Sequence, residues 1–236
     1  RGNGHIGTNI THLAPAISGI PLSISEKGHL VIRGEAVISY ADFEQFIIES
    51  EGDYANPRNL ASGSLSLKDV EEVKQRHIQW IPFTLVYCEQ KITSWGKRMQ
   101  WLEEQGFHPV ERQNIEQPTT ENIQQEIDAF TAKVTNKKNP FPVDGLVICY
   151  DDTSYAATGS VTGHHATRAG YAFKWQDEHA DTELDHIEWS CAANTITPVA
   201  VFKPVELEGT TVQRASLCNV SECERLGIGG KGTRLQ

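Results

Sequence analysis

The sequence predicts an α+β protein that continues into an all-β module. Stretches that alternate like strands, such as residues 29–40, are interleaved with stretches of helical spacing, such as residues 40–50. From Thr182 onward the helical spacing gives way to short β segments, LDHIEWSC, ITPVAVFKPVEL and TTVQRASL. These suit a small barrel, with a domain boundary near residues 176–181. The 236 residues, of which 39% are hydrophobic, suffice for one large domain or two modest ones.

The strands are predicted from β-branched, alternating runs. In His29–Tyr40 (HLVIRGEAVISY) the alternation points Arg33 and Glu35 to one face. In Ile78–Cys88 (IQWIPFTLVYC), Pro82 indicates an edge strand or a bulge. Two further strands are predicted, a buried one after a proline-rich turn in Asn139–Tyr150 and a short one at Gly170–Trp175.

Leu67–Arg76 is predicted to be a short polar helix or a turn. Helical spacing of apolar residues predicts helices at Tyr40–Ser50, Ser94–Gln105 and Thr119–Val134. For the last of these, residues 120–122 are the predicted capping residues. Tyr54–Leu65 (YANPRNLASGSL) instead predicts a turn-rich loop, because the Asn56-Pro57 step disfavours regular structure.

Charge and cysteine usage restrict the class of protein. The formal net charge of −10 argues against a free-standing nucleic-acid-binding module, unless basic residues gather on one face or other domains hold the nucleic acid. The five cysteines are odd in number and form no zinc set, so reduced structural thiols in a cytoplasmic protein are expected. No apolar run approaches the roughly 18 residues that span a bilayer. Since the chain starts at Arg1 within a motif, its true N-terminus is expected to be missing.

Two segments hold polar residues whose placement suggests chemistry. YANPRNLASGSL displays Arg58, and the small residues after it would let a ligand approach closely, although a tight surface loop explains the same pattern. VDGLVICYDD places Asp144 at the mouth of an apolar strand, where a carboxylate can orient a metal-bound water or a lysine. A plain Asp-Gly turn is the alternative.

Three other features are more ambiguous. Lys174 lies in the aromatic YAFKW strand, where it either meets an anion or reaches out to solvent. The Gly-rich RGNGHIGTNIT, headed by Arg1, could cradle a phosphate or form a hairpin turn. His164 and His165 are adjacent and so point to opposite faces of a strand, which favours surface histidines over a metal site. The acidic run of residues 177–185 predicts a solvated linker.

Together and in this order, these segments resemble the bacterial NAD-dependent DNA ligases across nearly the whole chain. The matching segments are RGNGHIGTNIT, LVIRGE, YANPRNLASGSL, VDGLVIC, AGYAFKW and TPVAVFKPVELEGTTVQRASLCN. The resemblance implies a nucleotidyltransferase domain, of the DNA ligase and mRNA-capping type, over residues 1–178. This domain has antiparallel sheets with flanking helices, here without its first strands. Residues 179–236 are expected to begin an OB-fold barrel.

In that family a lysine of a K-x-D-G motif attacks the α-phosphate of NAD, forming a lysyl-AMP and releasing NMN. The AMP passes to the 5′-phosphate at a nick in duplex DNA, and the 3′-hydroxyl then displaces it. The resemblance therefore implies NAD as adenylate donor, Mg²⁺, nicked duplex DNA as substrate, and roles in DNA replication and repair. It further implies a monomer without a membrane partner, and zinc only in a C-terminal part beyond this chain.

Matching motifs assign roles to particular residues. The residues implied in catalysis are Asp144, Lys174 and Glu35. The residues implied in cofactor binding are Arg1, Glu35, Arg58, Phe83, Val147 and Lys174. In these roles Glu35 would accept hydrogen bonds from the ribose, Phe83 and Val147 would contact the two faces of adenine, and Lys174 would contact the AMP phosphate. Arg168 matches a further arginine of the family, so the resemblance implies that it helps to hold DNA or phosphate. Glu35, Arg58, Phe83, Asp144 and Lys174 are expected to line a single pocket shaped for an adenosine phosphate.

The sequence also departs from the family pattern. Cys149 stands in place of a second nucleotide-contacting lysine, and Ser66 in place of an arginine. Neutral side chains cannot replace fixed cations, so these changes bear on the adenylation rate and indicate a divergent subgroup. Acidic residues are also replaced, at Asn3, Thr8 and Asn9, while Lys137 and Lys138 are hypothesised to restore charge.

The chain contains no K-x-D-G motif, so the nucleophile of the family reaction is absent. We therefore predict that this chain alone cannot form a lysyl-AMP. Incubation with NAD followed by mass spectrometry should give no gain of one AMP; such a gain would contradict the prediction.

Two rival functions remain open from the sequence. One is an ATP-dependent nucleotidyltransferase of the same superfamily, which a comparison of ATP with NAD would distinguish. The other is a degenerate nucleotide- or DNA-binding module, favoured by Cys149 and Ser66 but opposed by the retention of Glu35, Asp144 and Lys174. Nick sealing by the full-length protein would decide between that module and a ligase.

Overall fold

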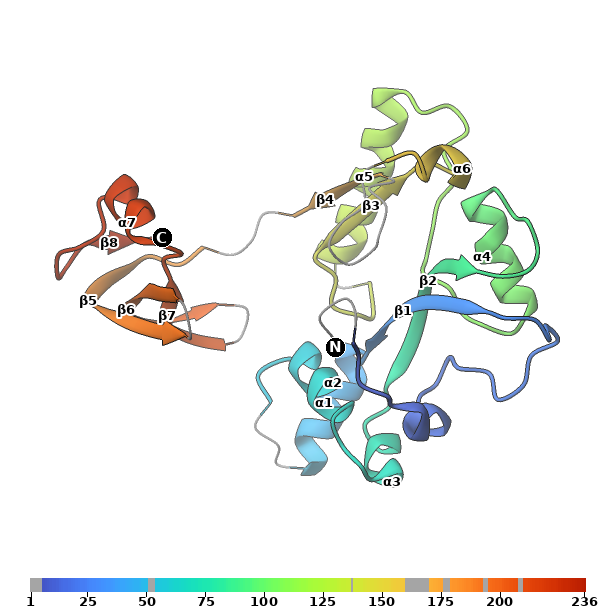
Figure 1. Cartoon of the computed structure of the whole chain (residues 1–236), viewed down its shortest axis with the longest axis horizontal. Helices are drawn as coiled ribbons and strands as arrows, with labels where there is room; N and C mark the ends of the chain where they lie inside the picture. The colour runs from blue at the N-terminus through green and yellow to red at the C-terminus, as the bar shows by residue number, and fades with distance from the viewer. Residues whose placement is uncertain are drawn as a thin grey trace. The chain divides into compact units, whose positions relative to one another are not determined.

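The chain folds into two compact units, Arg1–Trp175 and Gln176–Gln236, each drawn in Figure 1. The computed structural model describes residues 6–50, 54–136, 138–159, 170–175, 179–192, 195–207 and 210–236. It mixes helices with antiparallel sheets, which confirms the predicted α+β class. None of the helices in these ranges is long and apolar enough to cross a membrane.

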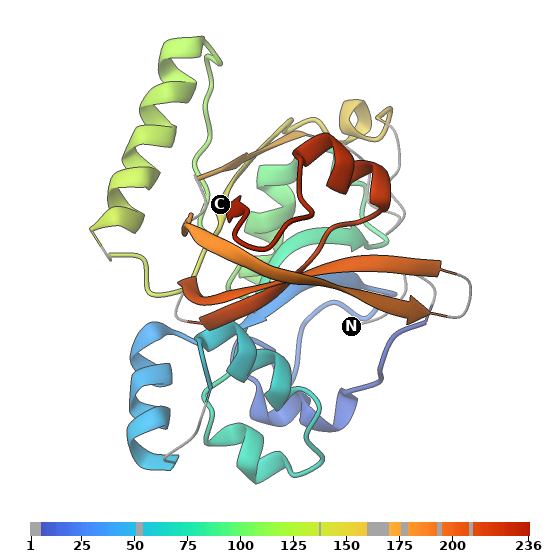
Figure 2. The same ribbon diagram turned by 90° about the vertical axis from the view of Figure 1, so that its left-hand side faces the viewer.

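The first unit holds two separate antiparallel strand pairs, β1–β2 and β3–β4, with helices around them (Figures 1 and 2). Its strands are β1 (Val31–Val37), β2 (Gln79–Tyr87), β3 (Gly145–Cys149) and β4 (Gly170–Lys174). Its helices are η1 (Thr11–Ala16), α1 (Tyr40–Ser50), α2 (Pro57–Ser64), α3 (Val70–Lys74), α4 (Trp95–Glu104), α5 (Thr120–Thr135) and α6 (Thr153–Ala156).

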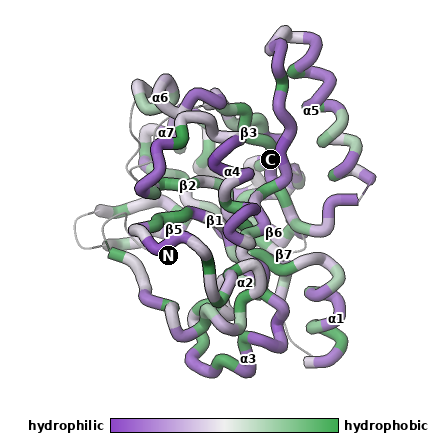
Figure 3. The backbone as a smooth tube through the Cα atoms, turned by 90° about the vertical axis from the view of Figure 1, so that its right-hand side faces the viewer, coloured by the Kyte–Doolittle hydropathy of each residue, from purple (hydrophilic) through white to green (hydrophobic). Residues whose placement is uncertain are grey.

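Most predicted elements are present at nearly their predicted positions, because their hydrophobic periodicity was long and regular. Helix α1 has the predicted bounds, and α4 is capped by Ser94, whose hydroxyl accepts from the backbone N–H of Lys97. The cap of α5 was predicted one residue too late, since Thr119 accepts from Asn122. The short helices η1 and α6 were not predicted. Figure 3 shows hydrophobic and hydrophilic stretches alternating along α5, as an amphipathic helix requires.

The prediction of a loop at Tyr54–Leu65 was wrong, because residues 57–64 form helix α2. Asn56 adopts an extended backbone and its side chain accepts from the N–H of Asn59, which caps the helix. Pro57 then occupies the first turn, where its missing N–H costs nothing. The Asn-Pro step therefore starts a helix here and places Arg58 in its first turn.

Strand β2 bulges beside Pro82, as the sequence predicted. Arg33 pairs with Thr84 but Gly34 pairs with Pro82, so Phe83 has no partner residue on β1. The extra residue shifts the alternation of β2, which buries Pro82 before the bulge and Leu85 after it.

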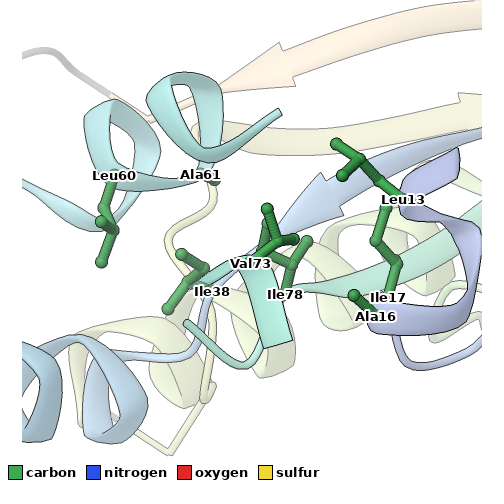
Figure 4. Packing of buried hydrophobic residues seen from close by; sticks show 8 residues of the cluster. All are labelled: Leu13, Ala16, Ile17, Ile38, Leu60, Ala61, Val73 and Ile78. Atoms are coloured by element: carbon green, nitrogen blue, oxygen red, sulfur yellow. The ribbon is translucent and has the colours of Figure 1, made fainter. Parts of the chain in front are cut away.

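The main core of the first unit lies where η1, α2 and α3 meet the ends of β1 and β2. Leu13, Leu60, Val73 and Ile78 are fully buried in it, and Figure 4 shows their side chains with those of their neighbours. A second core joins α4 to β2 through Leu85, Met99 and Leu102. The burial of each leucine or methionine side chain in these two cores contributes roughly 1.5–3 kcal/mol to the stability of the fold. Both cores therefore contain residues in or next to β2.

The β3–β4 pair is more exposed than the predicted buried strand. Val147 is 77% exposed and Tyr171 74% exposed, because a two-stranded sheet leaves little surface to cover either face. Gly145 is the first residue of β3, not part of a turn. A Cβ there would collide with the backbone of Phe173 and Lys174 on β4. Glycine at position 145 therefore permits close approach of the two strands next to Asp144.

The second unit is a four-stranded antiparallel sheet in the order β7-β6-β5-β8. Its elements are β5 (Thr182–Ala192), β6 (Thr195–Leu207), β7 (Thr210–Ser216), α7 (Val220–Leu226) and β8 (Arg234–Leu235). Leu184, Ala200 and Phe202 form its core. The sequence predicted the three long strands but not α7, which begins at the Asn219 cap and ends at Gly227 with φ 65°.

A histidine on β5 lies between two carboxylates of the same strand. His186 Nδ1 lies 2.9 Å from Asp185 Oδ2 and its Nε2 lies 3.3 Å from Glu188 Oε1. The hydrogen bond to Asp185, and next that to Glu188, raise the pKa of His186 above its ordinary 6.5. Both carboxylates also face cations, since Lys231 pairs with Asp185 and Arg214 with Glu188.

We predict that His186→Gln lowers the thermal midpoint of the whole chain most at acid pH. Because the folded state binds the proton more tightly, the stabilisation is complete below pH 6.5 and is lost as pH rises through the raised folded-state pKa. The gap between wild type and variant should therefore shrink from about pH 6 to about pH 8 in calorimetric scans. A gap that does not change with pH would contradict this prediction.

Candidate functional site

An ion pair joins two of the site residues predicted from the sequence. Arg58 Nη2 lies 2.5 Å from Asp144 Oδ1, although the residues are 86 positions apart in the chain. Their side chains are 59% and 55% exposed, so the pair contributes at most about 1 kcal/mol to stability. Its significance is geometric, because it brings the first turn of α2 to the start of β3.

Lys174 lies one ladder position away from Asp144 through the pairing of β3 with β4. It is directly opposite Gly145, the residue after Asp144, and the N–H of Trp175 donates to the Asp144 carbonyl oxygen at 3.3 Å. Since residues paired across an antiparallel ladder share a face, Lys174 shares one with Gly145 and Val147. Lys174 is exposed, and its side chain has no hydrogen bond or ion pair within the described ranges.

Glu35 and Phe83 lie on the other strand pair. Glu35 is exposed on β1 opposite Ile81, and half-buried Phe83 is the unpaired bulge residue two positions further along β2. Helix α2, which carries Arg58, is in contact with β1. Among the described residues, neither Glu35 nor Phe83 has a side-chain hydrogen bond or ion pair to the group formed by Arg58, Asp144 and Lys174. The structure thus brings Arg58 and Asp144 into contact, places Lys174 one ladder position away, and places Glu35 and Phe83 on the neighbouring sheet.

Cys149 lies on the same face of β3 as Val147, two positions further on. Partial desolvation by its surroundings, and then the negative charge of Asp151, raise the pKa of its thiol above the ordinary 9.0. The thiol therefore stays neutral at pH 7 and supplies no charge to this face. Ser66, the other departure, is exposed just after α2. All five cysteines are free, and only Cys223 among them is buried, so a structural packing role fits few of them.

Arg76, which the sequence analysis did not single out, holds the helix that carries Arg58. Its side chain is 7% exposed and donates to Ser64 Oγ on α2 at 3.1 Å, to Tyr54 Oη at 3.2 Å and to Glu72 Oε1 at 2.6 Å. Its guanidinium also lies 5.2 Å from the centre of the Phe46 ring. An arginine two residues after a short helix gave no signal of such burial.

Several predicted residues fall outside the described ranges, and the structure gives no account of them: Arg1, Asn3, Lys137, His164, His165 and Arg168. Two surface hollows of about 530 and 300 Å³ have none of the predicted site residues in their linings. Within the described ranges, no group of three or more His, Cys, Asp or Glu side chains is arranged to hold a metal ion.

Comparison with known proteins assigns the family. The model of the NAD-dependent DNA ligase adenylation domain matches residues 1–178, and that of the NAD-dependent DNA ligase OB-fold domain matches residues 181–233. The chain belongs to the NAD-dependent DNA ligase family. Its two folding units are accordingly an adenylation domain and an OB-fold domain, as the resemblance implied.

Proteins named DNA ligase resemble nearly the whole chain. That of Lachnoclostridium phytofermentans is 40% identical over 99% of this chain, and that of Ruminiclostridium cellulolyticum is 38% identical over 97%. A third, from Leptospira biflexa, is 34% identical over 97% of the chain. The chain spans about a third of the length of these ligases, 36%, 35% and 34% respectively.

Proposed function

We propose that the full-length protein seals nicks in duplex DNA with NAD as the adenylate donor, and that this chain supplies most of its nucleotide site. The observation that carries the proposal is the Arg58–Asp144 ion pair, with Lys174 opposite the next residue of β3, in a chain of this family. The domain limits proposed are residues 1–178 for the adenylation domain and 179–236 for the start of the OB-fold.

In this proposal each side chain acts through its own chemistry. Lys174 contacts the phosphate of AMP with a charge-assisted hydrogen bond, typically worth about 1.5–3 kcal/mol. Asp144, which Arg58 already contacts, orients the attacking lysine from outside this chain. On the other sheet, Glu35 accepts from the ribose hydroxyls and Phe83 stacks on adenine, with Val147 on the opposite face of the ring. Arg1 contacts NAD, and Arg168 contacts DNA or phosphate.

The side chains near the position proposed for the AMP phosphate limit how Mg²⁺ could bind. Asp144 is a carboxylate at this position, and it is paired with Arg58. Phosphate oxygens of the substrate would therefore provide most of the coordination, as is usual for this ion. The ion would supply charge neutralisation at the phosphates. A monomeric cytoplasmic protein acting in replication and repair, with zinc held only by a C-terminal part, completes the proposal.

The test uses the full-length protein, NAD and a nicked duplex with a 5′-phosphate. Sealing with release of NMN and AMP is expected with NAD, whereas ATP should support none. Sealing with ATP alone would favour the ATP-dependent alternative. Binding of a nucleotide that lacks nicotinamide, without any sealing, would favour a degenerate binding module. The neutral thiol of Cys149 supports that alternative.

A further inference from the structure

A dense set of hydrogen bonds surrounds Asp151, two residues after β3. Its carbonyl oxygen accepts from the N–H of Trp95 at 2.7 Å. Its carboxylate Oδ1 accepts from the N–H of Gly96 at 2.8 Å and from Ser94 Oγ at 3.0 Å. All three donors belong to the first turn of α4 and its cap, where unpaired N–H groups favour an anionic acceptor. Asp151 thus completes the N-terminus of a helix that is 55 residues away in the chain.

Thr153 extends this junction. Its N–H and its Oγ1 donate to the carbonyl oxygen of Thr93, at 2.7 Å and 2.8 Å. We call residues 93–96, together with Asp151 and Thr153, the α4–β3 clasp. It is a double-sided connection, because each segment offers backbone and side-chain groups to the other.

The clasp joins the two separate strand pairs of the first unit. On one side, α4 packs against β2 through Met99 and Leu102 in the second core. On the other side, the clasp leads directly from the end of β3. No described strand of β1–β2 pairs with one of β3–β4, so contacts outside the ladders must set the angle between the sheets. At the opposite end of β3, the Tyr40 N–H donates to the Pro140 carbonyl oxygen at 2.9 Å.

We infer that Asp151 is a positioning residue, which fixes the sheet of Asp144 and Lys174 relative to the sheet of Glu35 and Phe83. The inference rests on the proposed function. Strand β3 has five residues and so spans about 17 Å. A change of only about 3–4° in the angle at which the clasp holds β3 would therefore displace its other end, where Asp144 and Lys174 lie, by about 1 Å. Displacements of that size in a reacting group can lower rates about 100-fold.

The test compares Asp151→Ala with two matched variants in the full-length protein. Asp151→Asn keeps an oxygen that accepts from Gly96 and Ser94. Asp152→Ala removes a neighbouring carboxylate that also accepts two hydrogen bonds, from Ser154 and Tyr155, but these lie within its own short helix α6. The readouts are kcat and KM for NAD in AMP transfer, with the concentration of active enzyme determined by titration.

Asp151→Ala should lower kcat about 10- to 100-fold and change KM for NAD by less than about threefold. Asp151→Asn and Asp152→Ala should stay within about threefold of wild type. The inference is overturned if Asp151→Ala and Asp152→Ala have equal kcat, or if Asp151→Asn loses as much as Asp151→Ala. If Asp151→Ala does not fold, Thr153→Val removes one clasp hydrogen bond at similar volume and takes its place in the comparison.

Hydrogen–deuterium exchange separates this inference from the proposed function. Asp151→Ala should accelerate exchange at residues 145–149 of this chain more than Asp152→Ala does, whether or not the protein is a ligase. An inactive wild-type protein with this exchange pattern would refute only the ligase function. An active wild type with equal exchange in both variants would refute only the positioning role.

Discussion

Replacing Lys174 with alanine in the full-length protein should slow formation of the lysyl-AMP about 100- to 1,000-fold, the usual cost of removing one preorganised contact to developing charge. Lys174 is paired with Gly145, the residue after Asp144, and its side chain has no hydrogen bond or ion pair to another described side chain, so its ammonium is available to a phosphate. Since Cys149 offers no second cation on this face, little can compensate. Single-turnover transfer of labelled AMP from NAD measures the rate.

The matched control is Lys97→Ala, which removes an exposed lysine from α4 on a helix without a predicted site residue. It should leave the adenylation rate within about twofold, and both variants should melt within a few degrees of wild type because surface substitutions cost little. An adenylation rate for Lys174→Ala within about fivefold of wild type would contradict the assigned role.

Replacing Arg76 with alanine should lower the free energy of unfolding of this chain by about 2–4 kcal/mol. The change leaves Ser64, which is fully buried, without its guanidinium donor, and it removes the group that lies between the rings of Phe46 and Tyr54. It also opens a cavity between α1, α2 and α3. Urea denaturation followed by tryptophan fluorescence measures the loss.

Lys74→Ala provides the comparison, two residues earlier. Lys74 is 66% exposed and its nearest carboxylate, on Glu71, is 3.9 Å away, so its removal should cost less than about 0.5 kcal/mol. Arg76→Met should fall between the two, because it fills the volume without the hydrogen bonds. Equal stability of Arg76→Ala and Lys74→Ala would show that the buried contacts of Arg76 contribute nothing.

Local patterns in the sequence predicted much of the fold. The amphipathic spacing of α1 and α4 and the alternation of β1 and β2 each repeat over enough residues to define an element. Helices α2 and α7 were missed, although both begin with an asparagine cap. At Asn56-Pro57 the capping side chain and the fixed φ of proline act together, and weighing the proline as a breaker alone produced the wrong prediction.

The candidate site was predicted only through resemblance, since no spacing rule joins Arg58 to Asp144. That ion pair depends on how α2 packs beside β3, which is a property of the tertiary structure. The same holds for Arg76 and Asp151, whose partners lie in other elements. A lone arginine or aspartate in a polar stretch is normally solvated, so burial and multiple hydrogen bonding could not be read from its neighbours in sequence.

The unpaired Phe83 has a consequence for how this gene can vary in length. Removing its codon would make Pro82, Thr84 and Leu85 consecutive, so their pairing with Gly34, Arg33 and Ile32 could continue without a bulge and with Leu85 still turned inward. An in-frame deletion at this position would therefore remove one aromatic side chain and leave the core side chains of β2 in place. Among homologues, a one-residue difference in the length of β2 should fall at this bulge, whereas other insertions and deletions should accumulate in the connections between elements, where no alternation has to be preserved.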